Sequence, residues 1–249
     1  MDGEFLSIGG MWLAVPLWTL YGLLCGILLV YGLNSYVLLG TYARMRRSAL
    51  RADRERIKAF EMRLGSGEVD WPAVLTQIPI YNELNVAERI MRAVSAIDYP
   101  KDRHAIQVLD DSTDETRDIV DAVAAELRGS GARIEVVRRE RRVGYKAGAL
   151  QHGMERDASP FIAIFDSDFV PERDFLKRMV PHLHEAPGLG LVQARWSHLN
   201  RSDNWLTRAI SVGIDGHFVV EQAARCWTGW FWNFNGTGGV WRRQAIEDA

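Results

Sequence analysis

An uncharged stretch near the N-terminus is the strongest constraint on how this chain can fold. From Phe5 to Ala43 the sequence contains no Asp, Glu, Lys or Arg, and this run exceeds the ~20 apolar residues that a helix needs to span a bilayer. Acidic residues precede the run and arginines follow it, which is not the pattern of a cleaved secretory signal. We predict an uncleaved transmembrane helix over residues 1–43, rather than a core helix of a soluble protein.

The charges beside this helix predict the side of the membrane on which the rest of the chain lies. Arg44, Arg46 and Arg47 follow its C-terminal end, and basic clusters favour the cytoplasmic side. We expect a chain embedded in the cell (inner) membrane with its main domain in the cytoplasm. The net charge is −2 and no basic tract is long, so no nucleic acid is expected as a partner. Cys25 and Cys226 lack the spacing of a disulfide framework or a zinc site.

The remaining sequence predicts a tether followed by an α/β domain. Residues 44–72 are charged and predict a solvated surface helix that ends at a Gly-Ser-Gly break. Beyond them, short apolar runs alternate with amphipathic stretches. The predicted strands are 73–80, 105–110, 133–138 and 161–166, and the predicted helices are 85–97, 114–128 and 146–156. This order predicts a mainly parallel sheet, covered by helices, within a domain of residues 73–249.

Polar residues follow each predicted strand, in the segments PIYNE, DDSTDE, RRERRVGYKAG and DSDF. Parallel sheets bind ligands beyond the carboxyl ends of their strands. Asp166 and Asp168 would project from the same face of their strand, where they repel each other unless a cation lies between them. A hard divalent cation, Mg²⁺ or Mn²⁺, suits two carboxylates and a diphosphate. A plain turn before Pro171 is the alternative, and the position after a buried strand favours the metal.

Two further segments in this region are candidates for nucleotide contacts. Asp110 and Asp111 end the second strand and could accept hydrogen bonds from a base or ribose, whereas the residues after them are suited to cap a helix. Lys146 lies in a Gly-rich segment before a helix, where Gly148 allows close backbone approach to a phosphate. Glycine and lysine are common in loops, so the segment around Lys146 is a weak signal by itself. Neither the P-loop motif nor the dinucleotide-binding fingerprint occurs in the sequence.

The C-terminal part of the chain combines aromatic and glycine residues. The segment RCWTGWFWNFNGTGGVWRR is suited to sugar stacking or to a membrane interface, although core packing explains most such residues. Its turn over residues 235–239 could line a pocket for a polyhydroxylated ligand. His217 and Glu221 are one helical turn apart. They could form an acid/base pair or bind a metal, but such a pair is more often a polar stripe on a helix. A strand and then a new helix are expected around Glu247.

The ordered set PIYNE, DDSTDET, GYKAGAL, DSDFVP and FNGTGGVWRR resembles the inverting family 2 glycosyltransferases. It is most similar to the membrane-bound branch of bacterial cellulose synthases and plant cellulose-synthase-like mannan and glucan synthases. The resemblance covers about residues 73–249. It implies a GT-A type, Rossmann-like nucleotide-diphospho-sugar transferase domain preceded by one transmembrane helix. The implied activity is transfer of a hexose from GDP-mannose or UDP-glucose to a growing β-glycan acceptor.

The resemblance also implies roles for individual residues. The family's nucleoside-binding positions match Pro79, Tyr81, Glu83, Asp110 and Asp111. The positions that hold the metal and the diphosphate match Asp166 and Asp168, which are therefore also the expected catalytic residues, and Lys146 would assist donor binding. The turn that contains Asn235, Gly236 and Thr237 would border the sugar and acceptor pocket.

The chain also departs from the family pattern. Family members carry their general base in a later acidic motif, Thr-Glu-Asp, and the polymerising branch adds Gln-x-x-Arg-Trp; neither occurs here. We therefore expect the N-terminal part of a larger synthase, which binds donor and transfers poorly or not at all. The alternatives are a non-processive transferase with a lipid-linked acceptor and a sugar-nucleotide-binding fragment without catalysis. A nicotinamide oxidoreductase shares the fold class but lacks its glycine fingerprint here.

Overall fold

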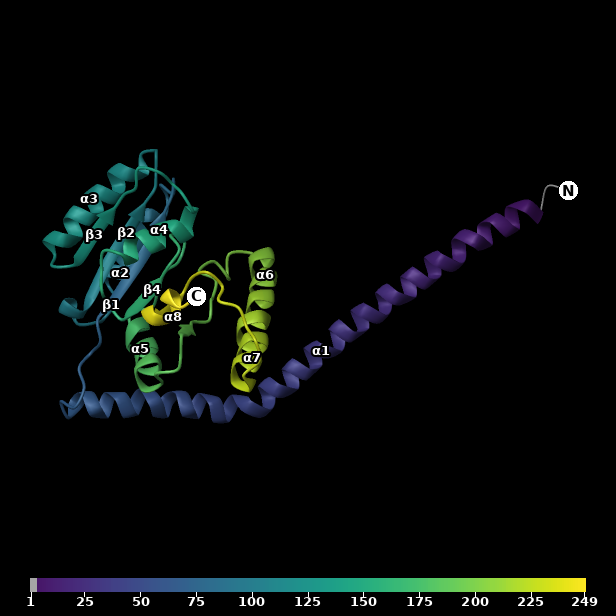
Figure 1. The fold of residues 1–249 in the computed structure, drawn as a ribbon, viewed down its shortest axis with the longest axis horizontal. Coiled ribbons are helices and arrows are strands. Elements are labelled where there is room, and N and C mark those ends of the chain that lie inside the picture. Colours follow the sequence, from purple (N-terminus) through teal and green to yellow (C-terminus); the bar gives the residue numbers. More distant parts are fainter. Residues whose placement is uncertain (1–3) are drawn as a thin grey trace. The chain divides into compact units, whose positions relative to one another are not determined.

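The N-terminal part of the chain is one long helix. A computed structural model describes residues 4–249, with side chains from residue 14 onward. Helix α1 (Glu4–Gly65) joins the predicted membrane helix and the predicted charged helix without a break (Figure 1). Large apolar side chains such as Trp18 and Leu28 are about 70% exposed along its first half. Among the described residues this is the one helix that is long and apolar enough to cross a membrane, with a mean hydropathy of 1.9 over an 18-residue window, which indicates membrane anchoring.

The chain divides into two compact units. The first comprises residues 1–49 and 197–232. In it, α6 (Trp205–Asp215), the π-helical segment η2 (Gly216–Gln222) and α7 (Ala223–Thr228) follow one another directly. Asn204 begins α6 with a capping box, in which its side chain accepts hydrogen bonds from the backbone N–H of Leu206 and Thr207. Tyr42 of α1 stacks on Trp227, with ring centroids 5.6 Å apart.

The second unit, residues 50–196 and 233–249, holds a six-stranded sheet. Its strands are β1 (Val74–Ile80), β2 (His104–Asp110), β3 (Arg133–Val137), β4 (Phe161–Ile164), β5 (Leu191–Gln193) and β6 (Gly239–Arg242). They are arranged in the order β3-β2-β1-β4-β6-β5. Strands β1 to β4 are parallel, and β6 is antiparallel to both of its neighbours. The predicted α/β fold with a mainly parallel sheet is confirmed.

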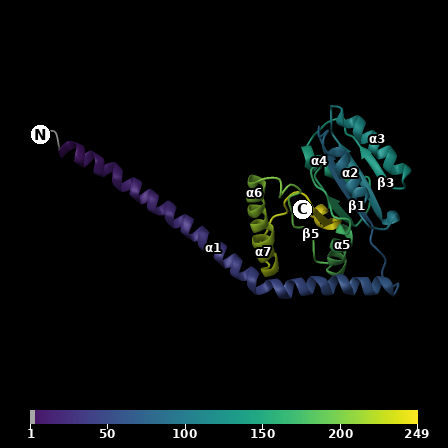
Figure 2. The ribbon, with the colours of Figure 1, turned by 180° about the vertical axis from the view of Figure 1, so that it is seen from behind.

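Helices cover both faces of this sheet (Figures 1 and 2). They are α2 (Ala87–Ser95), α3 (Thr116–Gly129), α4 (Tyr145–Met154), α5 (Phe175–Glu185) and the short α8 (Arg243–Glu247). Helices α2, α3 and α5 share one core cluster with Ile78 and Ile106, whereas Ala149 of α4 packs in a separate cluster with Leu109. Because residues alternate between the faces of a strand, β1 and β2 bury apolar side chains on both sides. The sheet is therefore the middle layer of three.

The C-terminal part of α1 belongs to the second unit and packs against it. Most of this segment is exposed, as predicted for a surface helix, but Phe60 is fully buried. Its ring lies 4.9 Å from that of Trp71 and 5.1 Å from that of His184. Arg63 adds an ion pair of 3.0 Å with Glu185 at the end of α5. The helix is therefore held by one buried aromatic side chain, which the sequence analysis did not predict.

His104 at the start of β2 should make the stability of the protein depend on pH. Its side chain is 6% exposed, and its Nε2 lies 2.8 Å from Thr76 Oγ1. Burial, followed by the charge of Arg133, lowers the pKa of His104 to about 4, whereas an unfolded histidine has a pKa of about 6.5. Between these values only the unfolded chain binds the proton, so acid favours unfolding.

We therefore expect the titration of His104 to lower the unfolding free energy of the protein by roughly 3 kcal/mol as the pH falls from 7 to 4. Urea denaturation of the chain in detergent at several pH values measures this change. The His104→Gln variant keeps a polar side chain that does not titrate, and its unfolding free energy should vary less over the same range. Equal pH dependence in both proteins would contradict the assignment.

Candidate functional site

A pocket of about 400 Å³ lies at the carboxyl ends of β1, β2 and β4. The chain runs from β1 to β2 on one side of β1, and β4 pairs with β1 on the other side. The strand order thus reverses at this point, where open α/β sheets bind their ligands. The pocket is lined by Pro79, Ile80, Tyr81, Glu83, Val86, Leu109, Asp111, Arg142, Lys146, Ala149, Asp166, Ser167 and Asp168.

The structure brings most of the sequence-predicted site residues to this pocket. Those that line it are Pro79, Tyr81, Glu83, Asp111, Lys146, Asp166 and Asp168. The remaining ones, Asp110, Gly148, Asn235, Gly236 and Thr237, are outside the lining but several contact residues that belong to it. The pocket is therefore assembled from residues far apart in the sequence.

Lys146 and Asp166 form the polar centre of one wall. The Lys146 ammonium donates a short hydrogen bond to Asp166 Oδ1 and another, of 2.8 Å, to the Gly236 carbonyl oxygen. The backbone N–H of Asp166 donates to Thr237 Oγ1 at 2.7 Å. Both charged side chains remain more than a third exposed, so they can also contact a ligand. The predicted turn thus supports Lys146 and Asp166 rather than lining the pocket itself.

The shape of that turn depends on glycine and on two side chains from the end of β5 and the segment that follows it. Gly236 and Gly238 have φ values of 85° and 68°, a left-handed conformation that glycine adopts without steric cost. Gln193 Nε2 and Trp196 Nε1 both donate to the Thr237 carbonyl oxygen, at 3.0 and 3.2 Å. The observed role of these two residues is to hold the turn.

Glu83 brings a third carboxylate close to Asp166 and Asp168. Burial, then the charges of Asp168 and Asp166, raise the pKa of Glu83, and Lys146 opposes this shift. Glu83 Oε2 is buried and accepts no hydrogen bond from the residues that the structure describes. The wall thus combines acidic oxygens with one unsatisfied acceptor.

This set of oxygens suits a divalent cation. No group of three or more His, Cys, Asp or Glu among the described residues forms a ready metal site. Mg²⁺ is usually held by one or two carboxylates together with substrate phosphates, rather than by a complete protein cage. The Asp166 and Asp168 carboxylates, with Glu83 behind them, fit that mode of binding.

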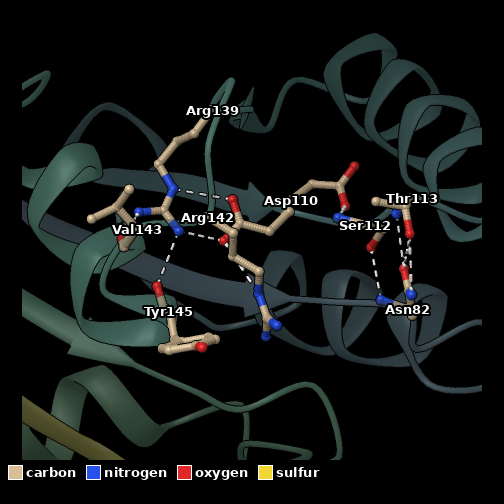
Figure 3. A network of polar contacts seen from close by, with 9 residues as sticks. Asn82, Asp110, Ser112, Thr113, Arg139, Arg142, Val143 and Tyr145 are labelled. Atoms are coloured by element: carbon tan, nitrogen blue, oxygen red, sulfur yellow. Dashed lines mark hydrogen bonds and ion pairs between the residues drawn. The ribbon is translucent and has the colours of Figure 1, made fainter.

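The two carboxylates after β2 differ in their surroundings. Asp110 is 2% exposed; its side chain accepts hydrogen bonds from the Ser112 backbone N–H and from Arg138 Nε, at 3.0 and 2.8 Å. Asp111 faces the pocket and is held by Arg139. Figure 3 shows Asp110, Ser112 and Arg139 together with Asn82, whose side chain accepts a hydrogen bond of 2.8 Å from the Thr113 N–H. Asp110 therefore has the position of a supporting residue, and Asp111 that of a ligand-contacting one.

An aromatic side chain and a guanidinium group stack at the same end of the pocket. Arg142 Cζ lies 3.4 Å from the ring centroid of Tyr81 and 5.2 Å from that of Tyr145. Arg142 Nε also lies 3.9 Å from Asp111 Oδ2. Planar groups stacked in this way form a platform for a flat ring such as a nucleobase.

Other candidates from the sequence lie outside this pocket. His217 Nδ1 is 3.3 Å from Glu221 Oε2, which belongs to the same helical stretch and also pairs with Arg225. This arrangement matches a polar stripe on a helix. The aromatic run is shared between the two units: Trp227 stacks on Tyr42 in the first, and Trp241 packs on Phe234 in the second, with centroids 5.1 Å apart.

Sequence reasoning missed the arginines that order the site. Arg138, Arg139 and Arg142 all come from the basic run after β3, which was noted as a polar strand end without assigned roles. Three arginines beside two adjacent aspartates were a usable signal, because such charges pair when a sheet brings neighbouring strand ends together.

Comparison with known proteins identifies the class of protein to which this fold and pocket belong. Residues 77–247 match the model of the family described as Glycosyl transferase family 2. The chain belongs to this family, which confirms the resemblance drawn from its motifs.

The chain is similar to plant enzymes of one kind. It is 44% identical over 220 residues to the probable glucomannan 4-beta-mannosyltransferase 7 of Oryza sativa subsp. japonica, covering 87% of this chain and 37% of the relative. It is 45% identical over 183 residues to the glucomannan 4-beta-mannosyltransferase 1 of Cyamopsis tetragonoloba, covering 72% of this chain and 35% of the relative. The chain thus spans just over a third of the length of these curated relatives.

A solved structure shares the fold. The mannosyltransferase PcManGT from Pyrobaculum calidifontis, in complex with GDP-Man and Mn²⁺, superposes with a TM-score of 0.55 at 23% identity, covering 85% of this chain and 58% of that one. The GT-A type fold expected for this domain is thereby confirmed.

Proposed function

We propose that this chain is the donor-binding part of a membrane-anchored, inverting β-glycan synthase that takes mannose from GDP-mannose. The observation that carries the proposal is the pocket at the strand-order reversal, where Asp111, Lys146, Asp166 and Asp168 converge. The names of the relatives, which are glucomannan mannosyltransferases, favour mannose over glucose as the transferred sugar. The long apolar helix supports anchoring, and the arginines that follow it favour a cytoplasmic site at the cell membrane.

In the proposed reaction, an acceptor hydroxyl oxygen bonds to the anomeric carbon while the bond from that carbon to the phosphate oxygen breaks. The configuration inverts, GDP leaves with the bonding electron pair, and the proton of the acceptor hydroxyl passes to a general base. A divalent cation held by Asp166 and Asp168 would stabilise the charge that develops on the departing diphosphate. Lys146 binds the same diphosphate through its ammonium group, since its partner Asp166 leaves it partly exposed to the pocket.

The other pocket residues bind the nucleoside. Tyr81 and Arg142 provide the stacking surface for the base, and the Asp111 carboxylate accepts hydrogen bonds from the ribose or base. The family resemblance places the general base in a later acidic motif. The part played by these described residues is therefore donor binding and leaving-group stabilisation.

Isothermal titration of the chain in detergent tests this proposal directly. We expect GDP-mannose to bind in the presence of Mn²⁺ and to bind at least about tenfold more weakly without it, a difference of about 1.4 kcal/mol. UDP-glucose should bind more weakly than GDP-mannose under the same conditions. Failure to bind either donor would refute the donor site, and tighter binding of UDP-glucose would refute the assignment of mannose.

A further inference from the structure

Arg139 lies outside the lining of the candidate donor pocket, but it contacts Asp111, which lines the pocket, and the loop that leads to Lys146. Its Nε donates to Asp111 Oδ1 at 3.1 Å and its Nη2 to Asp111 Oδ2 in a shorter bond. On its other side, Nη1 donates to the Val143 carbonyl oxygen at 2.8 Å and Nη2 to that of Tyr145 at 3.0 Å. Figure 3 shows the Arg139 side chain between these groups. All three guanidinium nitrogens are used, and we call this set of contacts the arginine bridge.

The loop side of the arginine bridge is a left-handed turn that leads directly into Lys146. Gly144 has a φ of 70° and Tyr145 a φ of 48°. A left-handed conformation at a residue with a Cβ, such as Tyr145, is strained and persists only where its surroundings enforce it. The two carbonyl groups that flank Gly144 are the ones that accept from Arg139. The guanidinium group is therefore what holds this turn closed.

Gly148 provides the space that the arginine bridge occupies. A Cβ atom at this position would lie 2.1 Å from the Val143 carbonyl oxygen and 2.8 Å from Arg139 Nη1. The Gly148 N–H donates to the Gly144 carbonyl oxygen at 2.9 Å. The glycine that was expected to admit a phosphate thus admits the chain's own loop and guanidinium group.

The pocket side of the arginine bridge orients a ligand-contacting carboxylate. Asp111 and Arg139 are only 8% and 10% exposed at their side chains. Each carboxylate oxygen has two acceptor sites, and a bidentate guanidinium fixes the plane of the carboxylate while leaving further acceptor capacity toward the pocket. A lysine at position 139 could neutralise Asp111. Its single ammonium group could not donate to both carboxylate oxygens of Asp111 and to both backbone carbonyl oxygens at once.

We infer that Arg139 is a positioning residue that couples the nucleoside end of the donor site to its diphosphate end. Through Asp111 it sets the geometry of the nucleoside contact, and through the Gly144–Tyr145 turn it places Lys146 beside Asp166. This inference rests on the proposed function, because it concerns the same donor. It adds a residue outside the pocket whose loss weakens both ends at once.

The test is titration of the chain in detergent with GDP and Mn²⁺. We expect Arg139→Lys to weaken GDP binding about 10-fold to 100-fold, since it removes several hydrogen bonds to charged or fixed groups. Arg141→Lys is the matched control, because Arg141 is exposed in the same loop and should bind GDP within about twofold of the original chain. Gly148→Ala should weaken binding as Arg139→Lys does, because its Cβ displaces both the loop and the guanidinium group while position 139 remains arginine.

A purely structural role is separated from coupling by a double-mutant cycle with Lys146→Ala. If Arg139 places Lys146, adding Lys146→Ala to Arg139→Lys should cost no more than about a further threefold, because the lysine is already misplaced. Losses that multiply in the double variant would overturn the coupling, as would GDP binding by Arg139→Lys equal to that of the Arg141→Lys control. If the unaltered chain binds no GDP, the proposed function fails instead. Circular dichroism of each variant confirms that it is folded.

Discussion

Asp166→Asn should reduce the affinity of the chain for GDP-mannose in the presence of Mn²⁺ by about 100-fold or more. The substitution removes one of two carboxylates that would hold the cation, and it also removes the ionic partner of Lys146. Changes to residues that merely support metal ligands typically cost 10- to 100-fold, so the loss of a ligand should reach at least the upper end. Asparagine keeps the size of the side chain and leaves the backbone N–H free to donate to Thr237, so the turn should remain intact.

Isothermal titration with GDP-mannose at fixed Mn²⁺ measures the effect. Glu172→Gln is the control: it removes one carboxylate from the loop that follows β4, at an exposed position outside the pocket lining. Asp168→Asn should behave like Asp166→Asn. If Asp166→Asn and Glu172→Gln bind the donor equally well, the Asp-Ser-Asp segment is a turn without a role in binding.

Phe60→Ala should lower the unfolding free energy by about 3–5 kcal/mol, the usual cost of removing a buried phenylalanine side chain. The ring is fully buried against Trp71 and His184, so its loss leaves a cavity between α1 and the sheet domain. The rest of this helix is mostly exposed and offers little to compensate. Because the donor pocket lies at the opposite, carboxyl ends of the strands, donor binding by the folded variant should change little.

Chemical denaturation followed by circular dichroism and tryptophan fluorescence measures this change. Met62→Ala is the matched control, because Met62 lies in the same helix and is 64% exposed. Substitutions at such positions usually stay within about 0.5 kcal/mol. Equal stability of the two variants would show that Phe60 does not fix the helix to the domain.

The parts of the fold that were predicted correctly are those with local signals. The four parallel strands are continuous apolar runs that end on polar residues, and the helices between them repeat apolar residues at helical spacing. The antiparallel pairing of β5 with β6 carried no such signal, because it joins segments of three and four residues more than 40 positions apart. Helix α5 was missed as well, and its internal Pro181 argues against a helix in any reading of local propensity.

In the candidate site, too, some residues have a local sequence signal and others depend on tertiary contacts. Asp166 and Asp168, which were predicted from a carboxylate pair after a buried strand, both line the pocket. For the adjacent Asp110 and Asp111, successive side chains of a strand point to opposite faces, so both could not face the pocket equally. Which of them does so depends on the pairing with Arg138 and Arg139 from another strand end. Tertiary contacts therefore decide which aspartate faces the pocket, and the local sequence pattern does not predict these contacts.

The strand order also determines when each part of the sheet can form while the polypeptide is synthesised on the ribosome. Chains fold from the N-terminus as they are made, and β1 to β4 complete a parallel sheet by residue 164. Strand β6, which covers the free edge of β4, and the turn that binds Lys146 and Asp166 are synthesised more than 70 residues later. The nascent domain therefore carries an open sheet edge, a template for pairing with other chains, throughout that interval. The hydrogen bonds that hold Lys146 and Asp166 at the donor pocket form only when Gly236 and Thr237 emerge.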